Sequence, residues 1–227
     1  MNTLALDTAD QVLSVALASE TGISYAELDA HNRHSELLMQ SADALCRTAG
    51  IKPADLGLVA CMRGPGSFIG LRIGFSAAKG IATALKIPLA AVPTLDCLAY
   101  PLSAWQGIAL PAMDAKKGCF FAALYREGLR LTDYMDASPQ TLADEIAKAR
   151  LFPSERVILT GCGAEMLHSR LAAYFPSGHI VVNPLARKGH AKELIEIAKD
   201  TILYGETNSE PVYLRKSDAE LNTGKNG

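Results

Sequence analysis

A basic surplus is absent from this sequence. Its 22 lysines and arginines are outnumbered by 24 aspartates and glutamates, which gives a formal net charge of −2. A protein that binds RNA alone usually carries excess positive charge, because neutralising phosphates dominates the affinity. We therefore expect any contact with RNA to be local or to be made through a partner.

Membrane-spanning and metal-binding patterns are also missing. No uninterrupted apolar stretch approaches the ~20 residues that a helix needs to cross a bilayer. The first residues, MNTLALDTAD, lack a basic flank followed by an apolar core. The five cysteines are scattered and never spaced C-x-x-C, which argues against a disulfide framework or a zinc site. These absences predict a cytoplasmic protein with no membrane contact.

Apolar residues are plentiful, at 49% of 227 residues, and their spacing alternates between strand and helix periods. The first half predicts the order βββαβαβ, with strands at 3–8, 11–18, 23–29, 56–61 and 87–92 and helices at 34–49 and 69–85. The second half repeats this order, with strands at 107–114, 118–126, 129–136, 156–160 and 179–182 and helices at 140–149, 163–174 and 190–204.

The repeated order suggests an internal duplication. Each half also ends its first strand in an aspartate, Asp7 and Asp114. We predict an α/β fold of two similar actin-like (RNase H-like) lobes that face each other across a cleft, each a mixed sheet in βββαβα order with flanking helices. The first lobe is expected at residues 1–102, the second at 103–215, and a polar, disordered tail at 216–227.

The predicted helix 69–85 has few polar residues. At 3.6 residues per turn they form one narrow stripe, which consists of Arg72, Ser76, Lys79 and Thr83. A helix with water on its whole outer side should show a wider polar face, so this helix should be covered on more than one side. Small residues recur at every fourth position on another face: Gly70, Gly74, Ala78 and Ala82.

Small residues at this spacing let a second helix approach closely. Glycine inside a helix costs ~1 kcal/mol relative to alanine, so a packing reason is needed. The helix at 34–49 also has apolar residues off its main stripe. Two interpretations stay open: the helices pack only within their own lobe, or they form an interface with a partner. The predicted interface consists of Leu37, Leu38, Ser41, Ala44, Leu45, Gly70, Ile73, Gly74, Ala77, Ala78, Ile81 and Ala82.

Two short segments precede these helices and form a candidate loop motif. Its residues are Arg33, His34, Glu36, Arg63, Gly64, Pro65, Gly66 and Ser67. The turn RGPGSF is not a P-loop, because no lysine and hydroxyl pair follows its second glycine. Its glycines suit either an anion site at the helix N-terminus or a sharp corner between strand and helix.

Catalytic patterns are weak. His31 and His34 are spaced H-x-x-H without a third metal ligand beside them, and neither H-E-x-x-H nor G-x-S-x-G occurs. We expect no metal site and no protease activity. Strand-end aspartates and glycine turns hold nucleotide in actin-like ATPases and sugar kinases, and the weak candidates here are Asp7, Asp114, Gly161 and Gly163. The first turn, DTADQ, contains no glycine to wrap a phosphate, so an independent ATPase or small-molecule kinase stays only an alternative.

Five segments in order along the chain resemble the bacterial TsaB family. They are RHSELLM (33–39), RGPGSFIGLRIGFSAAKGIATAL (63–85), IPLAAVPTLDCLA (87–99), MDAKKG (113–118) and PVYLR (211–215). The resemblance implies an actin-like protein that binds the catalytic paralogue TsaD. TsaD makes threonylcarbamoyladenosine at position 37 of tRNAs that read codons starting with A, and a small ATPase, TsaE, joins the complex.

The resemblance also implies which chemistry is lacking. By alignment, Thr94 and Leu98 stand where the catalytic paralogue carries an H-x-x-x-H metal pair. No catalytic residue and no cofactor of its own are therefore expected, whereas ATP or ADP at an interface shared with the partner stays open. The family is known to dimerise through the helices of its first lobe, so the expected states are a homodimer alone and a heterodimer with TsaD. Contact with tRNA is expected only through the complex.

Overall fold

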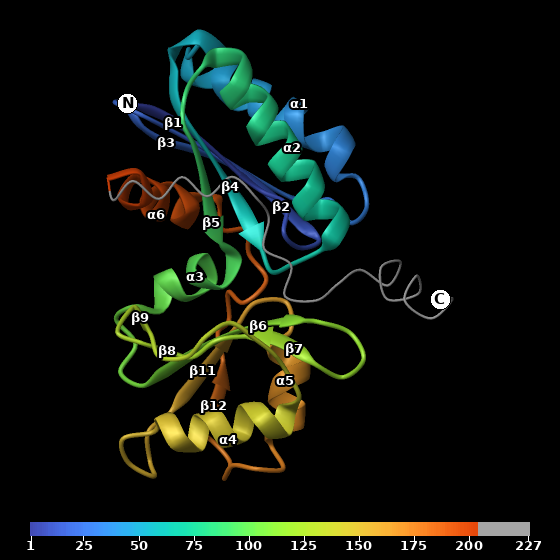
Figure 1. Cartoon of the computed structure of the whole chain (residues 1–227), viewed down its shortest axis with the longest axis vertical. Coiled ribbons are helices and arrows are strands. Elements are labelled where there is room, and N and C mark those ends of the chain that lie inside the picture. Colours follow the sequence, from blue (N-terminus) through green and yellow to red (C-terminus); the bar gives the residue numbers. More distant parts are fainter. Residues whose placement is uncertain (204–227) are drawn as a thin grey trace, which may run out of the picture.

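The computed structural model describes residues 1–203, which form two α/β lobes along the longest axis of the molecule (Figure 1). The PVYLR segment at 211–215, the predicted tail at 216–227 and the last position of the predicted helix 190–204 lie outside the described residues.

The first sheet has the strand order β3-β2-β1-β4-β5. β1 pairs antiparallel with β2 and parallel with β4, and β5 continues the parallel half. The strands are β1 (Asn2–Asp7), β2 (Val12–Ser19), β3 (Gly22–Asp29), β4 (Leu56–Gly64) and β5 (Leu89–Pro93). The apolar runs of the central strands are explained by this order, because strands inside a covered sheet are buried on both faces.

Two helices cover one face of this sheet (Figure 1). α1 (His34–Ala49) packs on β2 and β3, and α2 (Phe68–Leu85) packs on β4 and β5. Leu38 of α1 and Phe75 of α2 join a buried cluster with Leu4 and Leu6 of β1. α1 ends where predicted, because Gly50 adopts the left-handed conformation that closes a helix, at φ +67°.

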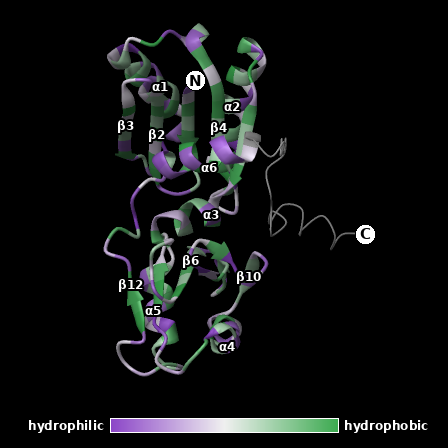
Figure 2. Cartoon of the chain, turned by 90° about the vertical axis from the view of Figure 1, so that its left-hand side faces the viewer, coloured by the Kyte–Doolittle hydropathy of each residue, from purple (hydrophilic) through white to green (hydrophobic). Residues whose placement is uncertain are grey.

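α6 (Ala191–Leu203) covers the opposite face of the first sheet and crosses in front of it in Figure 2. Leu194 and Ile195 pack with the alternate residues of the strands, among them Ala5 of β1 and Ala16 of β2. This placement corrects the expectation that the whole of 103–215 belongs to the second lobe. A sheet with two apolar faces needs a cover on each, and the chain returns to provide the second one.

The second sheet repeats the order of the first, as β10-β7-β6-β11-β12. Its elements are β6 (Ile108–Asp114), β7 (Phe120–Ala122), β10 (Met135–Ala137), β11 (Val157–Thr160) and β12 (Ile180–Val182), with helices α4 (Pro139–Ala149) and α5 (Ala164–Leu171). The strands of the second lobe therefore occupy the same places in their sheet as the corresponding strands of the first lobe. This confirms the predicted repetition of elements.

Three details differ from the predicted elements. The strand expected at 118–126 is divided into β7 and the short β8 (Tyr125–Arg126). The strand expected at 129–136 is likewise divided into β9 (Leu129–Arg130), which pairs with β8, and β10, which pairs with β7. A short helix, α3 (Thr94–Ala99), follows β5 and was not expected. Alternation of apolar residues cannot distinguish one bent strand from two that pair with different neighbours.

Candidate functional site

The first strand-end aspartate, Asp7, is buried and accepts a hydrogen bond from the residue that precedes α6. Its carboxylate accepts hydrogen bonds from the backbone N–H of His190 at 2.9 Å, from Ala9 N–H at 3.1 Å and from the Ser14 hydroxyl at 3.3 Å. An acidic side chain at a helix N-terminus satisfies donors that have no partner within the helix. Asp7 therefore acts as a cap across the sheet rather than as a free phosphate-site carboxylate.

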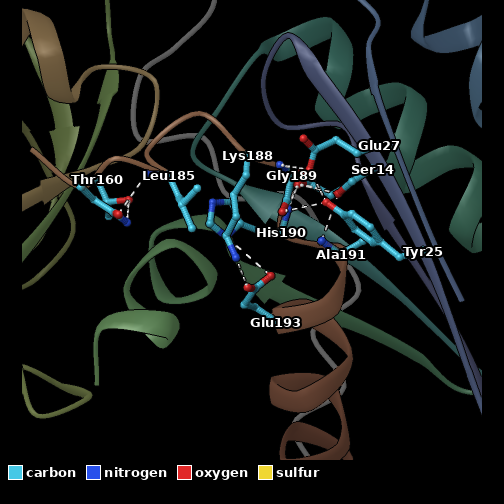
Figure 3. Close-up of polar contacts among 12 residues, drawn as sticks. Ser14, Tyr25, Glu27, Thr160, Leu185, Lys188, Gly189, His190, Ala191 and Glu193 are labelled. Carbon is cyan, nitrogen blue, oxygen red and sulfur yellow. Dashed lines mark hydrogen bonds and ion pairs between the residues drawn. The ribbon is translucent and has the colours of Figure 1, made fainter. Parts of the chain in front are cut away.

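Three residues of β2 and β3 make further hydrogen bonds to the segment that leads into α6 (Figure 3). Ser14 Oγ accepts from Ala191 N–H at 3.0 Å, and Glu27 Oε2 accepts from Gly189 N–H at 2.8 Å. The Tyr25 hydroxyl donates to the Gly189 carbonyl at 3.0 Å. These residues lie far from α6 in sequence and carry no motif, so the sequence contains no signal for them.

Burial perturbs two titrating groups in this attachment. Desolvation raises the pKa of Asp7 from its ordinary value of 3.8 to about 6, although the hydrogen bonds from His190, Ala9 and Ser14 oppose the rise. Desolvation lowers the pKa of His190 to about 4, against the attraction of Glu193. Neither ring nitrogen of His190 has a hydrogen-bond partner among residues 1–203. At neutral pH the imidazole is therefore uncharged.

The second strand-end aspartate, Asp114, has a different environment. Its side chain is partly exposed and forms an ion pair with the Lys116 ammonium at 2.7 Å, while the Lys116 N–H donates at 2.8 Å. Partial burial alone would raise the pKa of Asp114, but these two hydrogen bonds outweigh it and lower the pKa. Of the two strand-end aspartates, this one lies in the cleft between the lobes.

The two candidate glycines of the second lobe serve packing. Gly161 has φ +89°, and a Cβ on it would lie 2.6 Å from the Ala112 carbonyl oxygen. Gly163 donates its N–H to the same carbonyl at 2.9 Å. The turn is thus pressed against the end of β6, and Cys162 between the glycines is the residue that lines the cleft.

The cleft has a volume of about 450 Å³. Its lining combines the first-lobe turns with the end of β6, and includes Asp10, His31, Ser67, Ile69, Asp114, Lys116 and Cys162. Burial raises the pKa of the Cys162 thiol to about 12, so the thiol stays protonated and is a poor nucleophile. The described cleft therefore offers one ammonium and two carboxylates, but no activated nucleophile.

The RGPGSF part of the loop motif forms a sharp turn that packs against the turn after β1. Ser67 donates its N–H to the Ala9 carbonyl at 2.8 Å, and its hydroxyl accepts from Gly70 N–H at 3.3 Å. The Gly64–Pro65 peptide bond is cis, and a Cβ on Gly66 would lie 2.6 Å from the Ala9 carbonyl oxygen. Because these donors are already paired within the chain, the geometry favours the sharp corner over the anion site.

The side chains of the RHSE part of the motif also have partners within the chain. His34 is buried, and its Nε2 lies 2.8 Å from the Asp10 carbonyl oxygen. Arg33 pairs with Glu36 at 3.1 Å on the surface at the start of α1. His31 is exposed and lies 3.5 Å from Asp29. The two histidines thus have separate partners, and no group of three or more metal-ligating side chains is found in the described part of the chain.

The predicted partner surface on α2 needs a correction. Gly70 and Gly74 are buried, and a Cβ on them would lie 2.1 Å from the Thr8 carbonyl oxygen and 2.2 Å from the Thr8 hydroxyl. Ala78 and Ala82 are buried as well. The stripe of small residues therefore lets α2 approach its own sheet and the first turn, and it does not line an open groove.

A second row of residues on α2, apolar or small, faces outward. It consists of Ile73 and Ala77, which are half-buried, and Gly80 and Ala84, which are exposed. A Cβ on Gly80 would meet nothing within 4 Å, so no contact within residues 1–203 explains this glycine. The four residues of the polar stripe are all exposed beside this row.

The predicted residues of α1 divide in the same way. Leu38 is fully buried in the core of the lobe. Leu37, Ser41 and Leu45 are half-buried, and Ala44 is exposed. Ile81 of α2 is also half-buried. We name the outward set the α1/α2 outer face; it consists of Leu37, Ser41, Ala44, Leu45, Ile73, Ala77, Gly80, Ile81 and Ala84.

α2 is long and apolar enough to pass a length-and-composition test for a membrane span, and it is the one such helix among the described residues. Only six of its 18 residues are buried in the monomer. The helix nevertheless packs on β4 and α1 inside an α/β lobe. Its apolar surplus is thus surface that the described residues leave uncovered.

Thr94 and Leu98, at the positions of the catalytic paralogue's histidine pair by the alignment above, are both buried in α3. They lie four residues apart, which places them on one side of the helix. A hydroxyl and an isobutyl group do not replace two imidazole ligands. The hydroxyl of Thr94 has no hydrogen-bond partner among residues 1–203.

Comparisons with known proteins agree on one family. A family model described as TsaD, tRNA N6-adenosine threonylcarbamoyltransferase, matches residues 28–222. The tRNA threonylcarbamoyladenosine biosynthesis protein TsaB of Escherichia coli (strain K12) is 27% identical over 96% of each chain. TsaB of Bacillus subtilis (strain 168) is 35% identical over 127 residues, which is 56% of each chain.

Solved structures confirm the predicted two-lobe actin-like fold. YeaZ from Pseudomonas aeruginosa matches with a TM-score of 0.77 at 24% identity, covering 94% of this chain and 99% of that chain. A Bacteroides thetaiotaomicron protein with an actin-like ATPase fold matches with a TM-score of 0.50 at 9% identity, covering 87% and 95%. The family match covers most of the sequence, and the chain therefore belongs to the TsaD family of actin-like proteins, among the TsaB proteins of tRNA threonylcarbamoyladenosine biosynthesis.

Proposed function

We propose that this chain is a non-catalytic subunit of tRNA threonylcarbamoyladenosine biosynthesis, and that it binds and activates the catalytic paralogue TsaD through the α1/α2 outer face. The observation that carries the proposal is Gly80. Glycine within a helix destabilises it by ~1 kcal/mol relative to alanine, and here no neighbour in the lobe requires a glycine. A helix of a partner that packs closely against this row would require one.

The rest of the face supports the same interpretation. Ile73, Ala77 and Ala84 surround Gly80 with small and apolar side chains, and Leu37 and Leu45 on α1 add half-buried bulk. Two adjacent helices with outward apolar surface can join the matching pair of a homologous protein as a four-helix bundle. A second copy of this chain would present the same surface, so we propose a homodimer in the absence of TsaD.

The lack of catalytic groups supports an accessory role. Thr94 and Leu98 offer no metal ligands, and the cleft thiol of Cys162 is held protonated. Asp7, Gly161 and Gly163 are engaged in packing, which leaves Asp114 as the one nucleotide candidate in the cleft. We propose that any ATP or ADP in this cleft is bound at an interface shared with TsaD, that TsaE joins the complex, and that tRNA is reached through the complex in the cytoplasm.

The test uses two arginine substitutions on the same helix. Gly80→Arg adds a side chain where the monomer has open space, so the fold should be kept while close approach of a partner is blocked. Thr83→Arg adds the same charge on the exposed polar stripe and is the matched control. We expect Gly80→Arg to weaken TsaD binding by ~30-fold or more, which corresponds to a hot-spot loss of ~2 kcal/mol.

Isothermal titration calorimetry with purified TsaD measures this difference. Equal affinity of the two variants would contradict the proposed face. The accessory role is tested separately by reconstituting the tRNA modification with and without this chain. ATP turnover by the purified chain alone, with magnesium, would instead support the self-sufficient ATPase or kinase alternative.

A further inference from the structure

A second cavity, of about 600 Å³, lies apart from the cleft. It is bounded by the end of β4, by β5 and α3, by the β8–β9 hairpin, which lies beside α3 in Figure 1, and by α6. It shares no lining residue with the cleft. Its polar lining includes Arg63, Asp96, Tyr125, Arg130, Tyr134 and Asp200. Cavities of this size hold ligands as large as a mononucleotide.

Two arginines in this cavity have no acidic partner within the described residues 1–203. Neither Arg63 nor Arg130 forms an ion pair with a carboxylate of residues 1–203, and the buried Nε of Arg63 has no hydrogen-bond partner there. Arg130 lies over the Tyr134 ring at 4.0 Å. A buried guanidinium nitrogen without an acceptor is destabilising, so its presence calls for an explanation. Stacking fixes the second guanidinium in place.

Two acids, Asp96 and Asp200, line the same cavity, and the contacts of Asp96 are with tyrosines. Both carboxylate oxygens of Asp96 accept tyrosine hydroxyls, from Tyr125 at 2.5 Å and from Tyr134 at 2.8 Å. Burial, with Asp96 beside it, raises the pKa of Tyr134, and the charges of Arg130 and Arg63 oppose that rise. Arg63 and Arg130 line the same cavity as Tyr134, and the Asp96 carboxylate accepts the hydroxyls of Tyr125 and Tyr134.

An aromatic residue, Tyr100, also lines this cavity and is 44% exposed. Two guanidiniums bind a phosphate or carboxylate through several parallel hydrogen bonds, and a tyrosine ring stacks on planar groups. We propose that this cavity binds a phosphorylated small molecule of nucleotide size, with its phosphates on Arg63 and Arg130 and a planar ring against Tyr100.

The test measures binding of three probes to the full chain by isothermal titration calorimetry at low ionic strength. The probes are ADP, inorganic pyrophosphate and adenosine. We expect ADP and pyrophosphate to bind and adenosine to bind much more weakly, since the arginines supply most of the affinity. Arg63→Gln and Arg130→Gln should each weaken ADP binding by ~10- to 100-fold, because a charge-assisted hydrogen bond contributes ~1.5–3 kcal/mol.

Two controls locate the site. Arg170→Gln removes an exposed arginine of α5 that does not line the cavity, and it should leave ADP binding unchanged. Lys116→Gln removes the ammonium of the cleft and should do the same. Arg130 is exposed, so Arg130→Gln should fold even if Arg63→Gln does not; thermal melting of each variant checks this.

The remaining outcomes each overturn the proposal. Loss of ADP binding in Lys116→Gln but not in Arg130→Gln would assign the ligand to the cleft. Absence of binding for all three probes at millimolar concentration would mean that the cavity takes no phosphate. Binding of pyrophosphate without ADP would exclude a ligand of nucleotide size, and preference for adenosine would exclude the role of the arginines.

Discussion

Asp7 and Asp114 occupy the same position in the two lobes, at the end of the first strand of each sheet, yet their environments are opposite. Asp7 is buried and accepts N–H groups from the first turn and from α6. Asp114 is partly exposed and pairs with Lys116 in the cleft. The lobes repeat one topology, but α6 returns only to the first sheet, and this single asymmetry makes one aspartate a structural cap and leaves the other accessible.

A glycine packs against the end of the first strand in each lobe. Replacing these glycines should give the largest difference in the free energy of unfolding between the lobes. A Cβ on Gly70 would lie 2.1 Å from the Thr8 carbonyl oxygen, whereas one on Gly163 would lie 3.1 Å from its nearest atoms. We expect Gly70→Ala to lower the free energy of unfolding by about 3 kcal/mol and Gly163→Ala by about 1 kcal/mol. Gly80→Ala, in open space on the same helix as Gly70, should instead raise it by up to ~1 kcal/mol. Urea denaturation measures all three, and equal losses at Gly70 and Gly163 would contradict the comparison.

The second-largest difference in the free energy of unfolding is expected between substitutions of the two aspartates. Asp7→Ala removes the acceptor for two backbone N–H groups and the Ser14 hydroxyl, and we expect it to destabilise the fold by about 2–3 kcal/mol. Asp114→Ala breaks an ion pair whose lysine is exposed, so its effect should stay below ~1 kcal/mol. Urea denaturation at pH 7 compares the two variants. A larger loss for Asp114→Ala would mean that the cap on α6 does not stabilise the first lobe.

The pH dependence of stability should separate Asp7 from its neighbour His190. The pKa of Asp7 is raised to about 6 in the folded chain, so between about pH 4 and pH 6 the folded state binds more protons than the unfolded one. Asp7 therefore makes stability fall as pH rises through this window. The pKa of His190 is lowered to about 4, so the folded state binds fewer protons and this residue makes stability rise.

In the unmodified chain these two slopes oppose each other. Asp7→Asn should leave a stability that rises with pH between about 4 and 6, and His190→Leu should leave one that falls, each by about 2–3 kcal/mol over the window. Denaturant midpoints measured at several pH values give the slopes. Asp114→Asn serves as the control, since the pKa of Asp114 is lowered and its titration lies below this window. The same slope in Asp7→Asn and His190→Leu would refute the assignment.

The smallest effect is expected at Lys116. Its ammonium is exposed and forms an ion pair with Asp114. Lys116→Ala should change the free energy of unfolding by less than ~0.5 kcal/mol at physiological salt, because an exposed pair is screened and loses side-chain entropy. Thermal melting at low and high salt is the measurement. A loss above ~1 kcal/mol that salt does not reduce would show that the second strand end depends on its pair as the first depends on its cap.

Much of the fold could be predicted because its signals are local. The 3.6-residue spacing and Gly50 define α1, and the narrow polar stripe defines α2. The strand-end aspartates were found because each follows an apolar run. Their different roles could not be predicted, since the N–H that Asp7 accepts belongs to a residue 183 positions away. No local pattern encodes a contact at that separation.

The orientation of α2 also could not be predicted from the sequence. Counting small residues at every fourth position identified Gly70, Gly74, Ala78 and Ala82, but it could not say which side of the helix meets the sheet. The structure shows that this side meets Thr8 and that the row through Gly80 faces outward.

By itself, the sequence determined most of the helices and strands, the repeated order of the two lobes, the family and the surplus of apolar surface on α2. Only the tertiary structure decided which sheet α6 covers, which aspartate is buried, which glycine is open and that Arg63 and Arg130 line one cavity. The division has a physical reason. Periodicity and capping act within a few residues, whereas burial, desolvation and charge pairing depend on segments that only the folded chain brings together.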